Sequence, residues 1–268
     1  MNKPLPSDPA LGEVLMSAQK ITKRFGGLAA VNEVSVDLWR GRIHAVIGPN
    51  GAGKSTLTNL LAADLPLTSG QVTLLGQDVT GWSPEHIARQ GLGRSYQKTN
   101  IFLPFTVWEN VRLAAQSRDA QQPWNPLRWL HSTEATATHS IANNSRTARA
   151  IALAGLGSRR HSIAGTISHG EQRQLEIAMT LATEPQVLLL DEPLAGMGVA
   201  EAERMVELLL TLKPDHAMLL VEHDMDAVFA LADRLTVMVN GQVIASGTPP
   251  DVRANAQVQA AYLGEEAH

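Results

Sequence analysis

The chain has 268 residues and a formal net charge of -4, with 44% hydrophobic and 18% charged residues. This length and composition suffice for a hydrophobic core in one large domain or two modest ones. The slight acidic excess leaves no overall basic field, which argues against a dedicated nucleic-acid-binding protein, and we expect no nucleic-acid partner. Cysteine is absent, which excludes disulfides, thiolate metal sites and cysteine nucleophiles.

The sequence also lacks the patterns of a secreted or membrane-spanning chain. Its longest apolar run, residues 227–232, is far shorter than the ~18 residues that a membrane span needs. Residues 1–13 are rich in proline and have no apolar stretch of the kind that a signal peptide carries. We therefore expect a cytoplasmic protein with a flexible N-terminal tail, which would serve a membrane only through partner chains.

In chain order, the first part of the sequence alternates strand patterns with short helices. Helical periodicity at residues 54–63 follows a glycine-rich turn, and Ser83-Pro84 is typical of a helix start, with serine as the N-cap. The predicted strands lie at residues 14–17, 29–38, 43–47 and 72–75.

Strand patterns disappear between residues 94 and 184, where helix signals dominate. Thr106-x-x-Glu109 and Ser168-x-x-Glu171 both fit the capping box, in which two side chains satisfy orphan N–H groups at a helix start. This part of the chain is therefore predicted to be helical.

Residues 116–144 form a polar stretch within this region, and we predict that it is irregular. It contains Pro123, Pro126, Trp124 and Trp129. One interpretation is a surface loop with packed tryptophans. The other is a patch near a membrane or a partner chain, since tryptophan suits half-wet surfaces.

Strand patterns return at residues 187–190 and 217–221, with a predicted helix between them at residues 200–212. A hairpin follows, which turns at Asn240-Gly241. The whole pattern predicts an α/β core that is interrupted by a helical insertion.

The strongest functional signal matches G-x-x-x-x-G-K-[ST], after a predicted strand and at the start of a predicted helix. Its glycines let the backbone close around a phosphate, and successive N–H groups with the helix dipole form an anion site. Lys54 is placed to reach the β- and γ-phosphates of a nucleotide, and the Ser55 hydroxyl to ligate Mg²⁺. The candidate binding residues are Gly48, Pro49, Asn50, Gly51, Ala52, Gly53, Lys54, Ser55 and Thr56.

Two further predicted strands end in residues with useful chemistry. Asp191 and Glu192 follow residues 187–190, and His223 comes shortly after residues 218–221. If both strands are parallel neighbours of the strand before the phosphate loop, their ends form one crevice. Asp191 would then bind Mg²⁺, Glu192 would orient or deprotonate the attacking water, and His223 would hydrogen-bond the γ-phosphate.

The predicted helix after Ser168 offers a second phosphate-binding surface. Its start combines an exposed serine hydroxyl with Gly170, at the positive end of the helix dipole. One chain needs only one phosphate loop, so the second surface suggests a nucleotide that is shared between two chains.

The order of these motifs resembles the ATP-binding subunit of ABC transporters over roughly residues 14–250. The resemblance implies an α/β fold: a P-loop NTPase core with a mostly parallel sheet, an antiparallel β subdomain and an inserted helical subdomain at about residues 94–184. Residues 251–268 would form a C-terminal tail. The implied cofactors are ATP and Mg²⁺.

The same resemblance implies roles for individual residues. Phe25 would stack on adenine, although it is also explicable as a packed aromatic. The sequence departs from the common pattern at His169, where glycine is usual, and at Gly198, where aspartate is usual. The implied catalytic residues are Lys54, Gln97, Glu192 and His223; the metal-binding residues are Ser55, Gln97 and Asp191; and the signature residues are Ser168, Gly170, Glu171 and Gln172.

Four stretches are similar to the ATPases of branched-chain amino-acid importers: residues 168–177, 195–197, 221–225 and 261–265. This similarity implies an ATP hydrolase that energises uptake of branched-chain or similar hydrophobic amino acids. The partners would be a second ATPase subunit, identical or related, and two membrane permease subunits. A solute-binding protein would act indirectly, and the chain would lie peripherally on the cytoplasmic face of the inner membrane.

Other functions remain as alternatives. An ABC ATPase could instead serve urea, amide or aromatic-acid uptake, or the export of lipid or lipopolysaccharide. A soluble, non-transport ABC ATPase is a further alternative, but a repair ATPase would carry a long coiled-coil insertion, and the sequence has no sustained heptads.

Overall fold

A computed structural model describes residues 12–95, 100–119 and 133–263. The chain forms two compact units, which we describe separately: Met1–Leu92, Gln186–Glu192 and Leu210–His268 in the first, and Gly93–Pro185 and Pro193–Leu209 in the second. Most of the expected N-terminal tail lies outside the described residues, as do Gln97, Trp124 and Trp129. Within the described residues, no helix is both long and apolar enough to cross a membrane.

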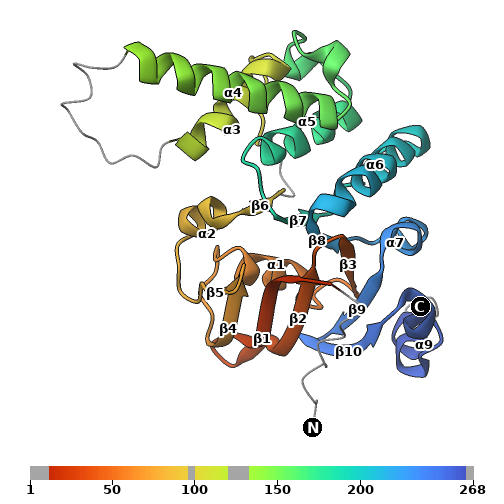
Figure 1. The fold of residues 1–268 in the computed structure, drawn as a ribbon. Coiled ribbons are helices and arrows are strands. Elements are labelled where there is room, and N and C mark those ends of the chain that lie inside the picture. Colours follow the sequence, from red (N-terminus) through yellow and green to blue (C-terminus); the bar gives the residue numbers. More distant parts are fainter. Residues whose placement is uncertain (1–11, 96–99, 120–132, 264–268) are drawn as a thin grey trace. The chain divides into compact units, whose positions relative to one another are not determined.

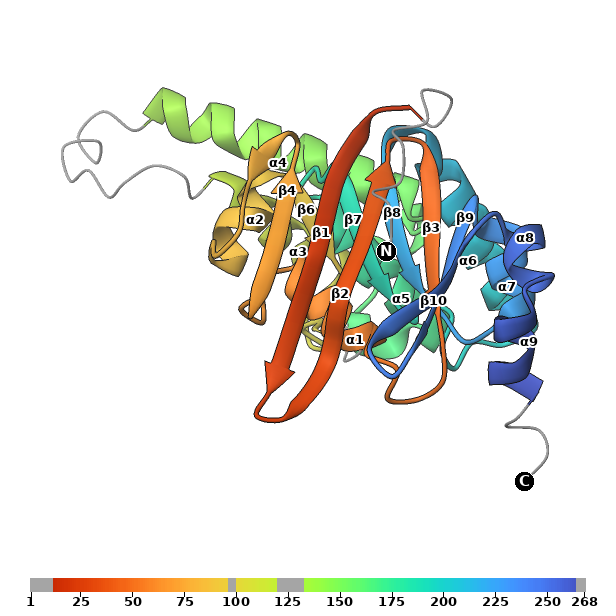
Figure 2. The same cartoon turned by 90° about the horizontal axis from the view of Figure 1, so that it is seen from below.

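The first unit contains an antiparallel sheet in the order β2-β1-β4-β5, of which β2, β1 and β4 are labelled side by side in Figure 2. Its strands are β1 (Val14–Phe25), β2 (Leu28–Trp39), β4 (Ser69–Leu74) and β5 (Gln77–Asp78). The strand predicted at residues 14–17 is therefore much longer than expected. The register of β1 against β2 shifts between Ala18 and Ile21, where Lys20 has a φ of +47°. This irregularity breaks the period-two pattern by which a strand is recognised in a sequence.

A second sheet has the order β10-β9-β3-β8-β7-β6. Its strands are β3 (Arg42–Ile47), β6 (Leu92–Arg94), β7 (Val187–Asp191), β8 (Ala217–Val221), β9 (Arg234–Val239) and β10 (Gln242–Gly247). The strands β9, β3, β8 and β7 run parallel, and β9 and β10 form the predicted hairpin. Every residue of β7 and β8 is buried, which explains their uninterrupted apolar sequences.

The helix α1 (Lys54–Leu61) shares one hydrophobic core with both sheets. Leu57 and Leu61 of α1 belong to the same buried cluster as Leu15 of β1, Leu38 of β2 and Leu189 of β7. This packing holds the start of α1 at the end of β3. The first unit also contains α2 (Pro84–Gln90), α7 (Met225–Leu231), α8 (Pro249–Arg253), α9 (Ala256–Leu263) and the short turn η4 (Lys213–Asp215).

The second unit is built around helices that contact one another, with α3 against both α4 and α5, and α4 against α5 (Figure 1). Thr106 and Glu109 form the predicted capping box before α3: each backbone N–H donates to the other residue's side chain, at 2.8 and 3.1 Å. The helices are α3 (Val107–Asp119), α4 (Thr133–Leu153), α5 (His169–Leu181) and the first part of α6 (Val199–Leu212), with the short turns η2 (Gly157–Arg159) and η3 (Ala164–Thr166).

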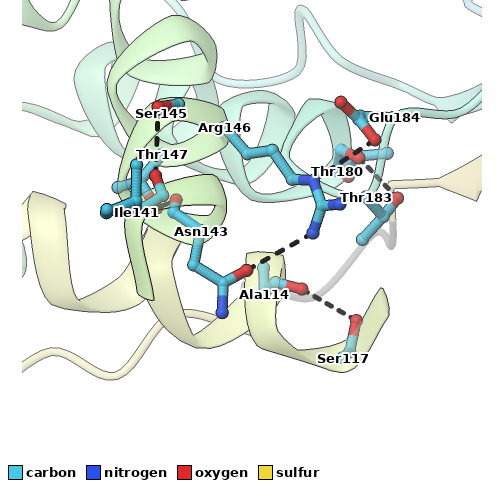
Figure 3. Close-up of polar contacts among 10 residues, drawn as sticks. All are labelled: Ala114, Ser117, Ile141, Asn143, Ser145, Arg146, Thr147, Thr180, Thr183 and Glu184. Atoms are coloured by element: carbon cyan, nitrogen blue, oxygen red, sulfur yellow. Dashed lines mark hydrogen bonds and ion pairs between the residues drawn. The ribbon is translucent and has the colours of Figure 1, made fainter. Parts of the chain in front are cut away.

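The prediction that residues 116–144 are irregular is wrong for all of the described part of that stretch. Residues 116–119 lie in α3, and residues 133–144 lie in α4. The side chains of Ser145 and Thr147 donate to the carbonyl groups four residues earlier, at 3.0 and 2.7 Å (Figure 3). Such bonds let polar side chains sit within a helix, and no proline or glycine interrupts α4.

Candidate functional site

The phosphate loop lies between β3 and α1, and two of its glycines are required by their surroundings. A β-carbon on Gly48 would overlap the carbonyl oxygen of Met238, and one on Gly53 would overlap that of Ala30. Gly53 also has a φ of +100°, which a side chain rarely tolerates. The loop can therefore take this shape only with glycine at both positions.

Hydrogen bonds hold the loop in this shape. The Lys54 ammonium is buried and donates to the carbonyl oxygens of Gly48 and Pro49, at 2.5 and 3.1 Å. The backbone N–H of Gly241, in the β9–β10 turn, donates to the carbonyl of Ala52 at 3.0 Å. The lysine charge thus already lies within the loop, while the side chain of Ser55 is exposed at the start of α1.

The ends of three parallel strands meet as predicted. Val46, near the end of β3, lies opposite Val221 at the end of β8, and Asp191 at the end of β7 lies opposite the same Val221. Asp191 is 3% exposed. The condition for a single crevice, that the strands are parallel neighbours, is therefore met within the first unit.

The structure brings Glu192 and His223 into direct contact. Oε1 of Glu192 lies 2.8 Å from Nε2 of His223. The backbone N–H of Glu192 donates to the carbonyl of Val221 at 2.9 Å, and its φ of +51° is unusual for a residue with a side chain. Strained backbone of this kind persists only where surrounding contacts fix it, and it occurs often at functional sites. The carboxylate and the imidazole, predicted from separate strands, form one pair.

Phe25 also belongs to the first unit. It is the last residue of β1, its side chain is 50% exposed, and the ammonium of Lys23 lies 5.1 Å from its ring centroid. An exposed aromatic face beside a cation is compatible with stacking on a base, which remains a prediction.

The signature residues lie in the second unit, at the start of α5. The predicted capping box is present: the Glu171 N–H donates to Ser168 Oγ at 3.2 Å, and the Ser168 N–H donates to a Glu171 carboxylate oxygen at 2.9 Å. Glu171 also pairs with Arg159 at 2.7 Å. The Gln172 side chain donates to the carbonyl of Ala164 at 3.1 Å. These contacts tie the start of α5 to Arg159 and Ala164 of the same unit.

Glu201 is a residue that the sequence did not indicate. It lies in the first turn of α6, and its carboxylate accepts a hydrogen bond from the Ser168 hydroxyl at 2.9 Å. A β-carbon on the buried Gly170 would lie 2.6 Å from Cδ of Glu201. The spacing of the two residues along the chain gives no signal for this contact, because β7 and its connecting segments separate α5 from α6 in the sequence.

The fold and the first-unit site together define an α/β protein with a phosphate loop for a nucleotide. Comparison with known proteins identifies the family: residues 31–195 match the ABC transporter family, and residues 242–268 match the branched-chain amino acid ATP-binding cassette transporter family. The chain belongs to the ABC transporter family. It is an ATP-binding subunit with the P-loop NTPase fold, as the motifs predicted, and membership implies ATP hydrolysis and membrane permeases as partners.

Similar proteins cover nearly the whole chain. The high-affinity branched-chain amino acid transport ATP-binding protein LivG of Escherichia coli K12 is 36% identical over 257 residues, which cover 95% of this chain and 100% of LivG. The corresponding protein BraF of Pseudomonas aeruginosa is 36% identical over 253 residues, with 94% and 98% covered.

Solved structures show the same fold. A nucleotide-free ATP-binding cassette of an ABC transporter has a TM-score of 0.79 and 28% identity, and the match covers 93% of this chain and 99% of that one. The ADP conformation of an ATP-binding cassette of an ABC transporter has a TM-score of 0.78 and 28% identity, with 94% and 99% covered.

Proposed function

We propose that this chain binds ATP with Mg²⁺ at the phosphate loop and hydrolyses it to drive solute uptake. The observation that carries the proposal is the meeting of three strand ends in the first unit. They bring together the loop with Lys54, the buried Asp191 and the Glu192–His223 pair. Phosphoryl transfer requires this combination of positioned cationic donors, a metal-binding acid and a group that orients water.

The loop fits the phosphates of ATP by its donor set. Lys54 now donates to carbonyl oxygens of its own loop, and the phosphate oxygens would be stronger acceptors for the same ammonium. The backbone of residues 48–56 and the start of α1 add N–H groups and a favourable dipole. Phe25 would stack on the adenine.

The residues present also fit Mg²⁺. The Ser55 hydroxyl and the Asp191 carboxylate are hard oxygen ligands, and we propose that both bind the ion, with Gln97 as a further ligand. Mg²⁺ usually binds through one or two protein side chains together with the phosphates, and it neutralises phosphate charge when bound.

Glu192 and His223 would act on the reacting groups. We propose that Glu192 orients the attacking water and accepts its proton, since its carboxylate lies at the end of the strand that also bears Asp191. His223 would donate a hydrogen bond to the γ-phosphate. Their contact of 2.8 Å means that the two side chains must rearrange or share the proton as the nucleotide arrives.

The signature at the start of α5 would act on the nucleotide of another subunit. We propose that Ser168, Gly170, Glu171 and Gln172 complete the site of a second copy of this chain, or of a related ATPase. Binding of both nucleotides would close the head-to-tail dimer, and hydrolysis would reopen it. The serine cap at a helix N-terminus supports this role, because such ends favour anions.

An exposed apolar surface in the second unit supports contact with the permeases. Phe102, Leu103 and Phe105 are 50%, 50% and 43% exposed, and the two phenylalanine rings stack with centroids 5.4 Å apart. The backbone N–H groups of Ala164 and Gly165 donate to the carbonyls of Phe105 and Leu103, at 2.8 and 2.9 Å. An ordered apolar surface that faces water is typical of a protein-binding site. We propose that it binds the permeases at the cytoplasmic face of the inner membrane, where a solute-binding protein would act through them.

We further propose that residues 14–250 form one ATP-binding domain, with its helical subdomain at about residues 94–184 and residues 251–268 as a C-terminal extension. The start of β1 at Val14 supports the first boundary. The extension carries α9, which contacts α8 and β10.

The proposed solute is a branched-chain or similar hydrophobic amino acid. The family match of residues 242–268 and the names of LivG and BraF support this choice. Cells that lack this chain should lose high-affinity uptake of leucine, isoleucine or valine, and the wild-type chain should restore it. If those uptakes stay normal while urea, amide or aromatic-acid uptake fails, the solute is wrong. A lipid-export defect with normal uptake would overturn the import function.

Two substitutions test the assigned chemistry. Glu192→Gln should abolish phosphate release and leave ATP binding intact, because it removes the base and keeps the shape of the side chain. Lys54→Ala should instead weaken ATP binding on the order of 100-fold, because it removes a charged donor to the phosphates. Calorimetric ATP binding and phosphate release, measured on the full chain, separate the two. Near-normal turnover of Glu192→Gln would overturn its role.

A further inference from the structure

The carboxylate of Glu201 occupies the start of α5, at the surface that we assign to the nucleotide of a second subunit. It accepts a hydrogen bond from the Ser168 hydroxyl at 2.9 Å. The carboxyl carbon lies so close to Gly170 that a β-carbon there would be only 2.6 Å away. The hydrogen bond from Ser168 lowers the pKa of Glu201, so the side chain is an anion at neutral pH.

This contact uses hydrogen-bond donors at the start of α5. A helix start has several backbone N–H groups without partners in the helix, and here the box of Ser168 and Glu171 satisfies two of the N–H groups around it. Glu201 takes the Ser168 hydroxyl, and its side chain fills the space beside Gly170. A phosphate at the same helix end would need both this donor and this space. A carboxylate and a phosphate therefore cannot both be bound there.

We propose that Glu201 is an internal competitor of ATP at the signature surface, and that its displacement sets the ATP concentration at which two copies of this chain close. The proposal rests on the proposed shared site. A phosphate carries more charge and more acceptor oxygens than a carboxylate, so the phosphate of a nucleotide bound to the second copy displaces Glu201. The displacement costs free energy, which weakens the net binding of the phosphate.

Arg204 offers the displaced carboxylate a second position. It lies three residues further along α6, where side chains face the same side of a helix, and its charge already acts favourably on Glu201. The side chain of Glu201 is not deeply buried, so it can move without unfolding the start of α5. Glu201 thus has two positions. It contacts the start of α5 when the two copies are apart, and it lies beside Arg204 when they have closed on the nucleotide.

The test uses the full chain with Glu192→Gln as the parent, so that ATP binds without being consumed. Sedimentation velocity over a series of ATP concentrations gives the concentration for half-maximal dimer. Adding Glu201→Gln should lower this concentration by roughly three- to tenfold, because a neutral amide competes less well for a helix start. Glu201→Ala should lower it at least as much.

Glu203→Gln is the matched control, because it removes the same charge from an exposed position two residues away on α6. It should leave the half-maximal ATP concentration unchanged. An unchanged or raised concentration with both Glu201 variants, which thermal unfolding shows to be folded, would overturn the proposal alone. A parent that stays monomeric at saturating ATP would overturn the closure of two copies of this chain, on which the competitor role rests.

Discussion

The two helix starts that we assign to phosphate binding, at α1 and α5, differ in what surrounds their N–H groups. The start of α1 follows Gly53, which has no side chain, and its first turn carries Lys54 and no acid. The start of α5 follows Ser168, whose side chain caps the helix, and two carboxylates, Glu171 and Glu201, lie against it. The first turn of α1 thus carries a cation, whereas two carboxylates accept hydrogen bonds at the start of α5, one of them paired with Arg159.

This difference matches the two proposed tasks. The loop before α1 must bind ATP within one chain, so its shape is held by backbone contacts that keep the helix end open to an anion. The start of α5 meets a phosphate only when a second subunit brings one. Its own side chains satisfy the helix until then, because unsatisfied N–H groups at a helix end cost stability. At the start of α5, the side chains of Ser168, Glu171 and Glu201 thus take the place of a phosphate until one is bound.

The largest expected difference is in the stability of two alanine variants, one at the glycine of each helix start. Gly53→Ala should destabilise the protein by roughly 4 kcal/mol, because it combines a left-handed φ with overlap of the Ala30 carbonyl, which is backbone. Gly170→Ala should cost only about 1 kcal/mol, because the three atoms nearest to its β-carbon all belong to Glu201, whose carboxylate can turn away and whose Cβ, at 3.0 Å, needs only a small shift. Urea unfolding of both variants makes the comparison. Equal losses would contradict the view that only the α1 end depends on its glycine.

Lowering the pH should also affect the stability of the region around the phosphate loop and of the start of α5 differently. His44, on the strand before the phosphate loop, is buried and hydrogen-bonded to Thr236 and to the carbonyl of Asp37, and burial lowers its pKa to about 4. The unfolded chain, with the usual pKa near 6.5, binds one more proton between pH 6.5 and 4, so stability falls with pH across this window. The loss should be about 2 kcal/mol at pH 5 and roughly 3 when complete. The pKa of Glu201 on the α5 side is lowered from 4.5, so its contribution fades only below that pH.

Unfolding midpoints at pH 7.5 and pH 5 measure this loss. His44→Gln removes the titrating group, so its stability, although lower, should vary less between the two pH values. His86→Gln, at an exposed position, is the control and should keep the pH dependence of the wild-type chain. A pH dependence that survives in His44→Gln would assign the loss to another group.

The sequence predicted those parts whose determinants are local. The strand–loop–helix around Lys54, the capping boxes at Thr106 and Ser168, and the turn at Asn240-Gly241 each depend on a few neighbouring residues with a fixed spacing. The parallel arrangement of β3, β8 and β7 was the condition set for a single crevice, and the family resemblance implied it through a mostly parallel sheet. The role of these residues in ATP chemistry stays a prediction.

Features that depend on contacts distant along the chain were not predictable. The extension of β1 to Phe25 relies on pairing with β2 across an irregular register. The pairing of Glu192 with His223 and the approach of Glu201 to Ser168 depend on how separate elements pack. In α4, the polar composition suggested an irregular stretch, but side chains such as Thr147 bond back to the helix itself.

The smallest expected change in stability comes from removing the capping hydroxyl of α3 or of α5. Ser168→Ala and Thr106→Ala each remove the capping oxygen of a complete capping box, so each should lower the free energy of unfolding by about 1 kcal/mol. The two variants should differ in function. Ser168→Ala should leave ATP binding to the monomer intact, because the phosphate loop is untouched, and should reduce ATP-driven dimer formation and turnover.

Thr106→Ala serves as the control for this loss of stability, because the start of α3 has no proposed contact with nucleotide. It should keep the ATPase rate of the wild-type chain at a temperature where both variants are fully folded. Circular dichroism melts establish that temperature, and phosphate release at saturating ATP gives the rate. If both variants lose turnover equally, the cap at Ser168 matters only for folding. If only Ser168→Ala does, the start of α5 contacts the nucleotide even though two carboxylates lie against it in the open form.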